Sequence, residues 1–131
     1  MAAPQKVFPS LPILVVDDDE ESLLALATTL RTVGITNLRT VSDSTVVPAI
    51  LGHEAFSLVL LDLNMPGLSG YEILGKATEL TCRPPFIIVT GSLPPPDVVT
   101  RLPSDVVAYL TKPVDRERLI GAVLAALDGS R

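Results

Sequence analysis

Five short segments rich in apolar and β-branched residues are spaced along the chain, each bounded by polar or turn-forming residues. Short apolar runs of this kind predict strands, and the continuous ones predict strands that are buried on both faces. The segments are Ile13–Val16, Leu38–Val41, Phe56–Leu61, Pro85–Val89 and Val106–Leu110.

Helical periodicity follows most of these strands. From Glu20 to Val33 apolar residues recur every three or four positions; Asp19 is the expected N-cap, and Gly34 supplies a stop. Further helices are expected from an Asp43-Ser44 cap to about Leu51 with Pro48 in the first turn, from Tyr71 to Leu80, and after Asp115 along Leu119, Val123, Leu124 and Leu127.

The alternation of strands and helices predicts an α/β fold. It consists of one doubly wound parallel sheet with right-handed crossovers and helices on both faces. One region breaks the pattern, because Pro94, Pro95, Pro96 and Pro103 leave room only for a short helix at about Asp97–Leu102. In such sheets ligands bind beyond the carboxyl ends of the strands, where the strand order switches.

Carboxylates stand at the ends of two expected strands. Asp17-Asp18-Asp19 closes the first strand, and Asp62 closes the third. Taken alone, the triplet would be read as the cap of a helix, where carboxylates favour the positive end of the dipole. Together with Asp62 it would crowd several negative charges into one crevice, which a divalent cation would stabilise. Hard oxygen ligands favour Mg²⁺, and Asp62 is the expected reactive group.

Two further polar residues end the fourth and fifth strands. Thr90 follows the run that ends at Val89, and Lys112 lies between the last strand and Pro113. A hydroxyl and an ammonium group aimed at the same crevice would stabilise a dianionic group formed on Asp62.

Composition narrows the class of protein. The chain has 131 residues, enough for one domain with one core, and a net charge of −5. It has no basic stripe, so direct binding to nucleic acid is not expected. No apolar stretch reaches the ~20 residues of a membrane helix, the N-terminus lacks signal-peptide order, and the single cysteine, Cys82, excludes a disulfide framework. A cytoplasmic location without a membrane partner is therefore expected.

In these motifs the chain resembles the receiver domains of two-component response regulators. The resemblance covers about residues 12–128, which leaves 1–11 as an N-terminal extension and 129–131 as a C-terminal tail. It implies a flavodoxin-like sheet with strand order 2-1-3-4-5. The motifs that carry it are Val15-Val16-Asp17-Asp18, Leu60-Leu61-Asp62-Leu63-Asn64-Met65-Pro66-Gly67, Val89-Thr90 and Lys112-Pro113.

The resemblance implies a phosphorelay mechanism. A sensor histidine kinase or a histidine phosphotransfer protein would donate a phosphoryl group to Asp62, the nucleophile. Asp18 and Asp62 would ligate Mg²⁺ directly, Asn64 would offer its backbone carbonyl, and Asp17 would act through water.

The remaining implied roles concern the phosphoryl group and the response to it. Lys112 would pair with one phosphoryl oxygen, and Thr90 would bind another and move on phosphorylation. Tyr109 matches the aromatic switch of the family, although a half-buried strand tyrosine is also common in cores. The chain would catalyse only its own phosphorylation and dephosphorylation, and would act on a partner protein or an output domain.

Two alternatives stay open at this point. A haloacid-dehalogenase-like phosphohydrolase also uses a strand-end aspartate with a Thr or Ser and a Lys around Mg²⁺, but Glu21 stands where that motif requires Thr or Val. A pseudo-receiver that serves only as a binding module would lack acceptor or metal residues, and none is missing here.

Overall fold

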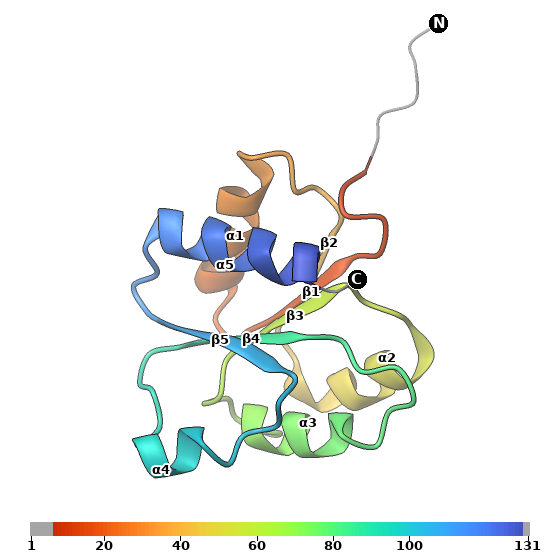
Figure 1. Cartoon of the computed structure of the whole chain (residues 1–131), viewed down its shortest axis with the longest axis vertical. Helices are drawn as coiled ribbons and strands as arrows, with labels where there is room; N and C mark the ends of the chain where they lie inside the picture. The colour runs from red at the N-terminus through yellow and green to blue at the C-terminus, as the bar shows by residue number, and fades with distance from the viewer. Residues whose placement is uncertain (1–6, 130–131) are drawn as a thin grey trace, which may run out of the picture.

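A computed structural model describes residues 7–129. Its centre is a five-stranded parallel sheet with the order β2-β1-β3-β4-β5, as the resemblance implied (Figure 1). The strands are β1 (Ile13–Val16), β2 (Leu38–Val41), β3 (Leu58–Leu61), β4 (Phe86–Thr90) and β5 (Val106–Thr111).

Helices cover both faces of the sheet, so the doubly wound prediction is confirmed. In Figure 1, α1 and α5 lie on one face, and α2 and α3 lie on the other. The helical elements are α1 (Glu20–Arg31), the 3₁₀ turn η1 (Ser44–Val46), α2 (Val47–His53), α3 (Gly70–Ala77), α4 (Pro96–Val99) and α5 (Arg116–Gly129).

The core consists of two apolar layers, one on each face of the sheet. On β1, Ile13 and Val15 point to the layer shared with α1 and α5, whereas Leu14 and Val16 point to the layer shared with α2 and α3. All four are essentially inaccessible to water, as the continuous apolar run predicts. Strands buried on both faces hold the residues at their ends in fixed positions.

The expected N-cap of the first helix is confirmed. The Asp19 carboxylate accepts a hydrogen bond from the Glu21 N–H at 3.2 Å. The helix ends at Arg31, two residues before the predicted end at Val33, and Gly34 follows with a φ of +85°. A left-handed glycine after the last turn is the usual way to leave a helix.

Several predicted boundaries were wrong by a few residues. Asp43 caps the 3₁₀ turn η1, and α2 starts only at Val47, because Pro48 needs a position in the first turn. The third helix ends at Ala77 rather than Leu80, and β3 starts at Leu58 rather than Phe56.

The short fourth helix was expected, but its range was not. It occupies Pro96–Val99 instead of Asp97–Leu102. Pro96 fits the first helical position because its missing N–H would be unpaired there in any case. The helix contains no buried residue.

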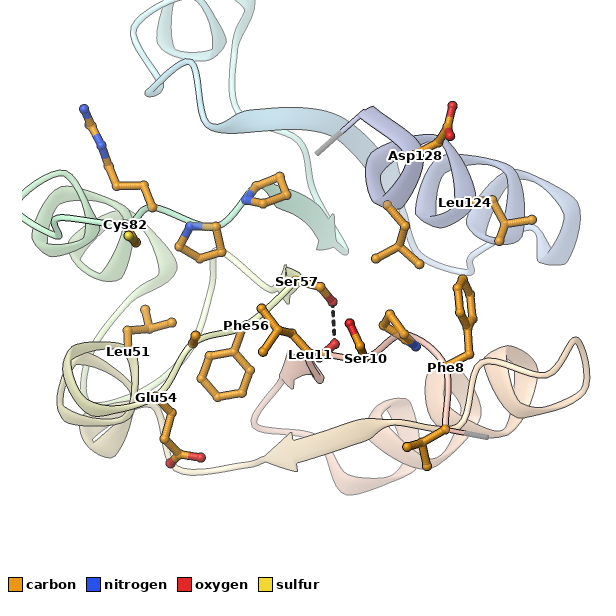
Figure 2. Close-up of a pocket in the computed structure, with 17 residues that line it drawn as sticks. Phe8, Ser10, Leu11, Leu51, Glu54, Phe56, Ser57, Cys82, Leu124 and Asp128 are labelled. Atoms are coloured by element: carbon orange, nitrogen blue, oxygen red, sulfur yellow. Dashed lines mark hydrogen bonds between the residues drawn. The ribbon is translucent and has the colours of Figure 1, made fainter. Parts of the chain in front are cut away.

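The segment before β1 closes the end of the sheet opposite the strand carboxyl ends. The Phe8 carbonyl accepts from the N–H groups of Thr36 and Asn37, and the Ser57 hydroxyl donates to the Leu11 carbonyl at 2.8 Å (Figure 2). Phe8 and Leu11 border a hollow of about 930 Å³ there. Among residues 7–129, no helix is both long and apolar enough to cross a membrane.

Candidate functional site

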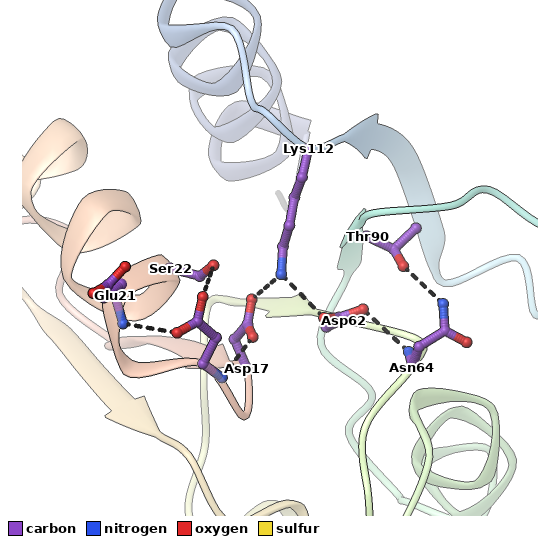
Figure 3. Close-up of polar contacts among 8 residues, drawn as sticks. Asp17, Glu21, Ser22, Asp62, Asn64, Thr90 and Lys112 are labelled. Atoms are coloured by element: carbon purple, nitrogen blue, oxygen red, sulfur yellow. Dashed lines mark hydrogen bonds and ion pairs between the residues drawn. The ribbon is translucent and has the colours of Figure 1, made fainter.

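Four sequence-predicted site residues meet at the carboxyl edge of the sheet. Asp17 follows β1, Asp62 follows β3, Thr90 ends β4 and Lys112 follows β5 (Figure 3). The strands place them side by side because β1 and β3 pair in parallel, as do β3 and β4 and then β4 and β5. The parallel register thus gathers residues from distant parts of the chain.

Lys112 bridges two carboxylates. Its Nζ lies 2.5 Å from Asp17 Oδ2 and 3.1 Å from Asp62 Oδ2. Burial lowers the pKa of Lys112, but the hydrogen bonds to Asp17 and Asp62 outweigh that effect, so its pKa is raised above the ordinary lysine value. The lysine is therefore a permanent cation at neutral pH.

Asp17 is nearly inaccessible, with 1% of its surface exposed. Burial raises the pKa of its carboxyl, and the hydrogen bond from Lys112 only partly offsets this. Its Oδ1 also accepts the Asp19 N–H at 3.0 Å, which holds the turn that leads into α1. The Asp17 carboxylate thus depends on neighbouring cations for its charge.

Three carboxylates form an acidic pocket that fits a metal ion. One oxygen from each of Asp17, Asp18 and Asp62 lies within 4.8 Å of the others. Asp17 and Asp62 are buried, whereas Asp18 is exposed to water. Hard anionic oxygens at an open edge suit Mg²⁺, which retains several waters.

Asn64 makes two contacts within the site. Its backbone N–H donates to Asp62 Oδ1 at 3.1 Å, and its side-chain Nδ2 donates to Thr90 Oγ1 at 3.3 Å. The side-chain contact was not predicted from the sequence, because it joins residues 26 positions apart. It gives the fully buried Thr90 hydroxyl a partner in this state.

The connection from β3 to α3 turns sharply after Asp62. Ser69 caps α3 in a capping box with Glu72, and the Gly70 N–H donates to the Leu63 carbonyl at 3.0 Å. A Cβ on Gly70 would lie 2.3 Å from the Asp62 carbonyl oxygen. This close approach between Gly70 and the end of β3 was not predicted from the sequence.

Comparison with known proteins decides the family. The pattern of the response regulator receiver domain matches residues 13–124. The chain belongs to the response regulator receiver domain family. TmoT, a response regulator protein from Ectopseudomonas mendocina, is 32% identical over 115 residues, which are 88% of this chain and 52% of TmoT. The receiver domain thus spans about half the length of the curated relatives it matches, or less.

Solved structures agree with the family. A CheY-like receiver domain protein from Methanospirillum hungatei JF-1 superposes with a TM-score of 0.81 at 30% identity, covering 92% of this chain and 95% of the other. The BeF3-activated DrrB receiver domain has a TM-score of 0.75 at 28% identity, covering 90% and 97%. This chain is therefore a receiver domain of the two-component type, and the dehalogenase and pseudo-receiver alternatives are not favoured.

Tyr109 is the one predicted site residue that lies away from the carboxylates. It stands on β5 in register with Ile88, partly buried against the apolar layer of α2 and α3. In this receiver domain it is a half-buried strand residue, and its role as a switch stays a prediction.

We expect Lys112→Met to destabilise the metal-free receiver domain by about 2 kcal/mol at pH 7, because two buried carboxylates lose their cation. The figure is below that for a fully buried pair, since the lysine side chain is 25% exposed. Urea unfolding measures the loss.

The pH dependence of this loss follows from the raised lysine pKa. Lys112 contributes its full stabilisation below the pKa of lysine in the unfolded chain, about 10.4. This contribution disappears as the pH rises through the higher pKa of Lys112 in the folded protein.

Lys76→Met, on the exposed side of α3, is the matched control for Lys112→Met and should change the free energy of unfolding by no more than about 0.5 kcal/mol. Equal losses in both variants would contradict the role of Lys112.

Proposed function

We propose that Asp62 is the phosphoacceptor of this receiver domain. One observation carries the proposal: a buried carboxylate, 6% exposed, lies next to a lysine ammonium group and close to two further carboxylates at the open edge of the sheet. An anionic nucleophile with a cation beside it suits phosphoryl transfer, which depends mainly on positioning and charge stabilisation.

In the proposed reaction an Asp62 carboxylate oxygen forms a bond to phosphorus, while the bond from phosphorus to the donor nitrogen breaks. The donor is a phosphohistidine of a sensor histidine kinase or a histidine phosphotransfer protein. Mg²⁺, held by Asp18, Asp62 and the Asn64 carbonyl, with Asp17 acting through water, would neutralise charge on the transferred group. The receiver domain changes only its own phosphorylation state.

Lys112 and Thr90 would receive the phosphoryl oxygens. The Lys112 ammonium group already contacts the Asp62 carboxylate and needs only a short movement to reach an oxygen bonded to it. Thr90 would exchange its bond to Asn64 for a bond to a phosphoryl oxygen. Tyr109 would respond by turning toward the space that Thr90 leaves, so that a partner protein or an output domain detects the change.

We infer that the receiver domain occupies about residues 12–128, with 1–11 as an extension and 129–131 as a tail. We also infer that it works in the cytoplasm, where its kinase partners would deliver the phosphoryl group, and that it contacts neither nucleic acid nor membrane directly, because its net charge is −5.

Chemical phosphorylation tests the proposed function. Incubation with acetyl phosphate and Mg²⁺ should add the mass of one phosphoryl group to the intact chain, and EDTA should prevent the addition. A chain that stays unmodified with Mg²⁺, or that is modified equally with EDTA, would overturn the proposal.

The acidic triplet offers a test of the metal assignment. We expect Asp18→Ala to weaken Mg²⁺ binding about ten-fold or more, since it removes one of three carboxylates at the pocket. Asp19→Ala removes the neighbouring carboxylate, which caps α1, and should leave Mg²⁺ binding near that of the wild type. Isothermal titration calorimetry measures both, and equal losses would mean that the ligands are wrongly placed.

A further inference from the structure

A buried hydroxyl lies behind the site, outside the group of charged residues. Ser44 is 2% exposed and belongs to η1, which precedes α2. Its Oγ donates to the Pro66 carbonyl at 3.0 Å and accepts the Leu68 N–H at 3.1 Å. A single side chain therefore holds the connection from β3 to α3, residues 62–69, on both sides of Gly67.

Gly67 gives this connection the shape that lets Ser44 reach both groups. Its φ is +81°, a conformation that other residues rarely adopt, and a Cβ there would lie 3.0 Å from Thr45 Cγ2. Thr45 is held in turn by Asp43, whose Oδ1 accepts its N–H at 3.0 Å and its hydroxyl at 2.6 Å. The connection thus rests on η1 with little room to shift.

The same connection sets the phosphoacceptor geometry. At its start the Asn64 N–H fixes Asp62 Oδ1, and at its end the Gly70 N–H binds the Leu63 carbonyl. Ser44 bonds to the segment between these two anchors. Because the Asn64 amide sits two residues before Pro66, a displacement at Pro66 moves the Asn64 backbone as well.

We propose that Ser44 is a positioning residue for phosphoryl transfer. Its hydroxyl holds the Pro66–Leu68 segment so that the Asn64 backbone aligns the Asp62 carboxylate and directs its own carbonyl toward the metal pocket. The inference rests on the proposed function, and Ser44 itself touches none of the reacting atoms. Mutation of residues that hold the metal ligands in place, without contacting the metal themselves, commonly changes metal affinity.

Ser44→Ala tests the proposal directly. In the metal-free protein the Leu68 amide should exchange with solvent about ten-fold faster, because it loses its acceptor. The Mg²⁺ dissociation constant should rise about ten-fold, and the rate of labelling by acetyl phosphate should fall by a similar factor. Gly67→Ala, whose Cβ would press against Thr45 of η1 and occupy a left-handed backbone conformation, should displace the connection and weaken Mg²⁺ binding in the same direction.

Ser57→Ala is the matched control. Ser57 also offers a hydroxyl to backbone groups, donating to the Leu11 carbonyl, but it lies at the opposite end of β3 (Figure 2). Its loss should leave Mg²⁺ affinity and labelling at the wild-type level, whatever it does to the midpoint of thermal unfolding.

The outcomes separate the inference from the proposed function. If wild type and Ser57→Ala bind Mg²⁺ and take up phosphoryl while Ser44→Ala matches them, Ser44 is structural only and the inference is overturned. If the wild type takes up no phosphoryl, the proposed function is wrong. In that case the exchange rate of the Leu68 amide still tests the hydrogen bond between Ser44 and Leu68. An unchanged rate in Ser44→Ala would refute the proposed role of this bond.

Discussion

Asp62→Asn abolishes phosphorylation by acetyl phosphate in our first expected result. The amide oxygen is a poor nucleophile, and the variant also removes one of three carboxylates at the metal pocket. Labelling should fall at least 10³-fold, below detection in an intact-mass spectrum, because the variant lacks the carboxylate oxygen that attacks phosphorus.

The variant should still fold, which keeps the result interpretable. Asparagine has the shape of aspartate, can still bond the Asn64 N–H, and leaves Asp17 to pair with Lys112. Asp97→Asn, an exposed substitution of the same kind on α4, is the control and should be labelled like the wild type. Stoichiometric labelling of Asp62→Asn would show that the phosphoacceptor is another residue.

The second large effect concerns stability. We expect Gly70→Ala to lower the free energy of unfolding by roughly 3 kcal/mol or more. Its Cβ would meet the Asp62 carbonyl oxygen at 2.3 Å and the Leu63 Cα at 2.7 Å, and both are backbone atoms that cannot rotate away. Either α3 or the end of β3 must move, so labelling at Asp62 should also slow.

Gly75→Ala provides a control within the same helix. A Cβ on Gly75 would meet nothing within 4 Å, and alanine favours the helix. It should stabilise the protein by about 0.5–1 kcal/mol. Urea unfolding measures the change in the free energy of unfolding for both variants, which should be negative for Gly70→Ala and positive for Gly75→Ala. An unchanged stability of Gly70→Ala would mean that the connection after Asp62 can shift to accommodate a Cβ.

Much of the fold was predictable because each strand carries its own signal. Ile13–Val16 is apolar throughout and lies buried on both faces, so its burial and its place inside the sheet follow from four residues. The site was predictable for the same reason, since parallel strands bring the residues at their carboxyl ends to one edge. Their positions at strand ends were enough to predict that Asp17, Asp62, Thr90 and Lys112 lie at that edge.

The remaining features depend on distances that no local pattern encodes. Ser44 and Leu68 lie 24 positions apart, and their bond exists only because η1 packs under the connection after β3. The contact between Asn64 and Thr90 is of the same kind. The start of α4 was misjudged at a proline, since Pro96 begins this helix rather than preceding it.

Because α4 is so short, it limits how far a structural change at Thr90 can spread through this molecule. A helix of four residues is about 6 Å long and buries none of its side chains, so it is anchored too weakly to turn as a rigid rod. Movement of Thr90 would fade within the turn that follows instead of being amplified at a distance. A protein that binds this receiver domain in response to such movement should therefore make contact close to Thr90 and Tyr109 rather than along α4.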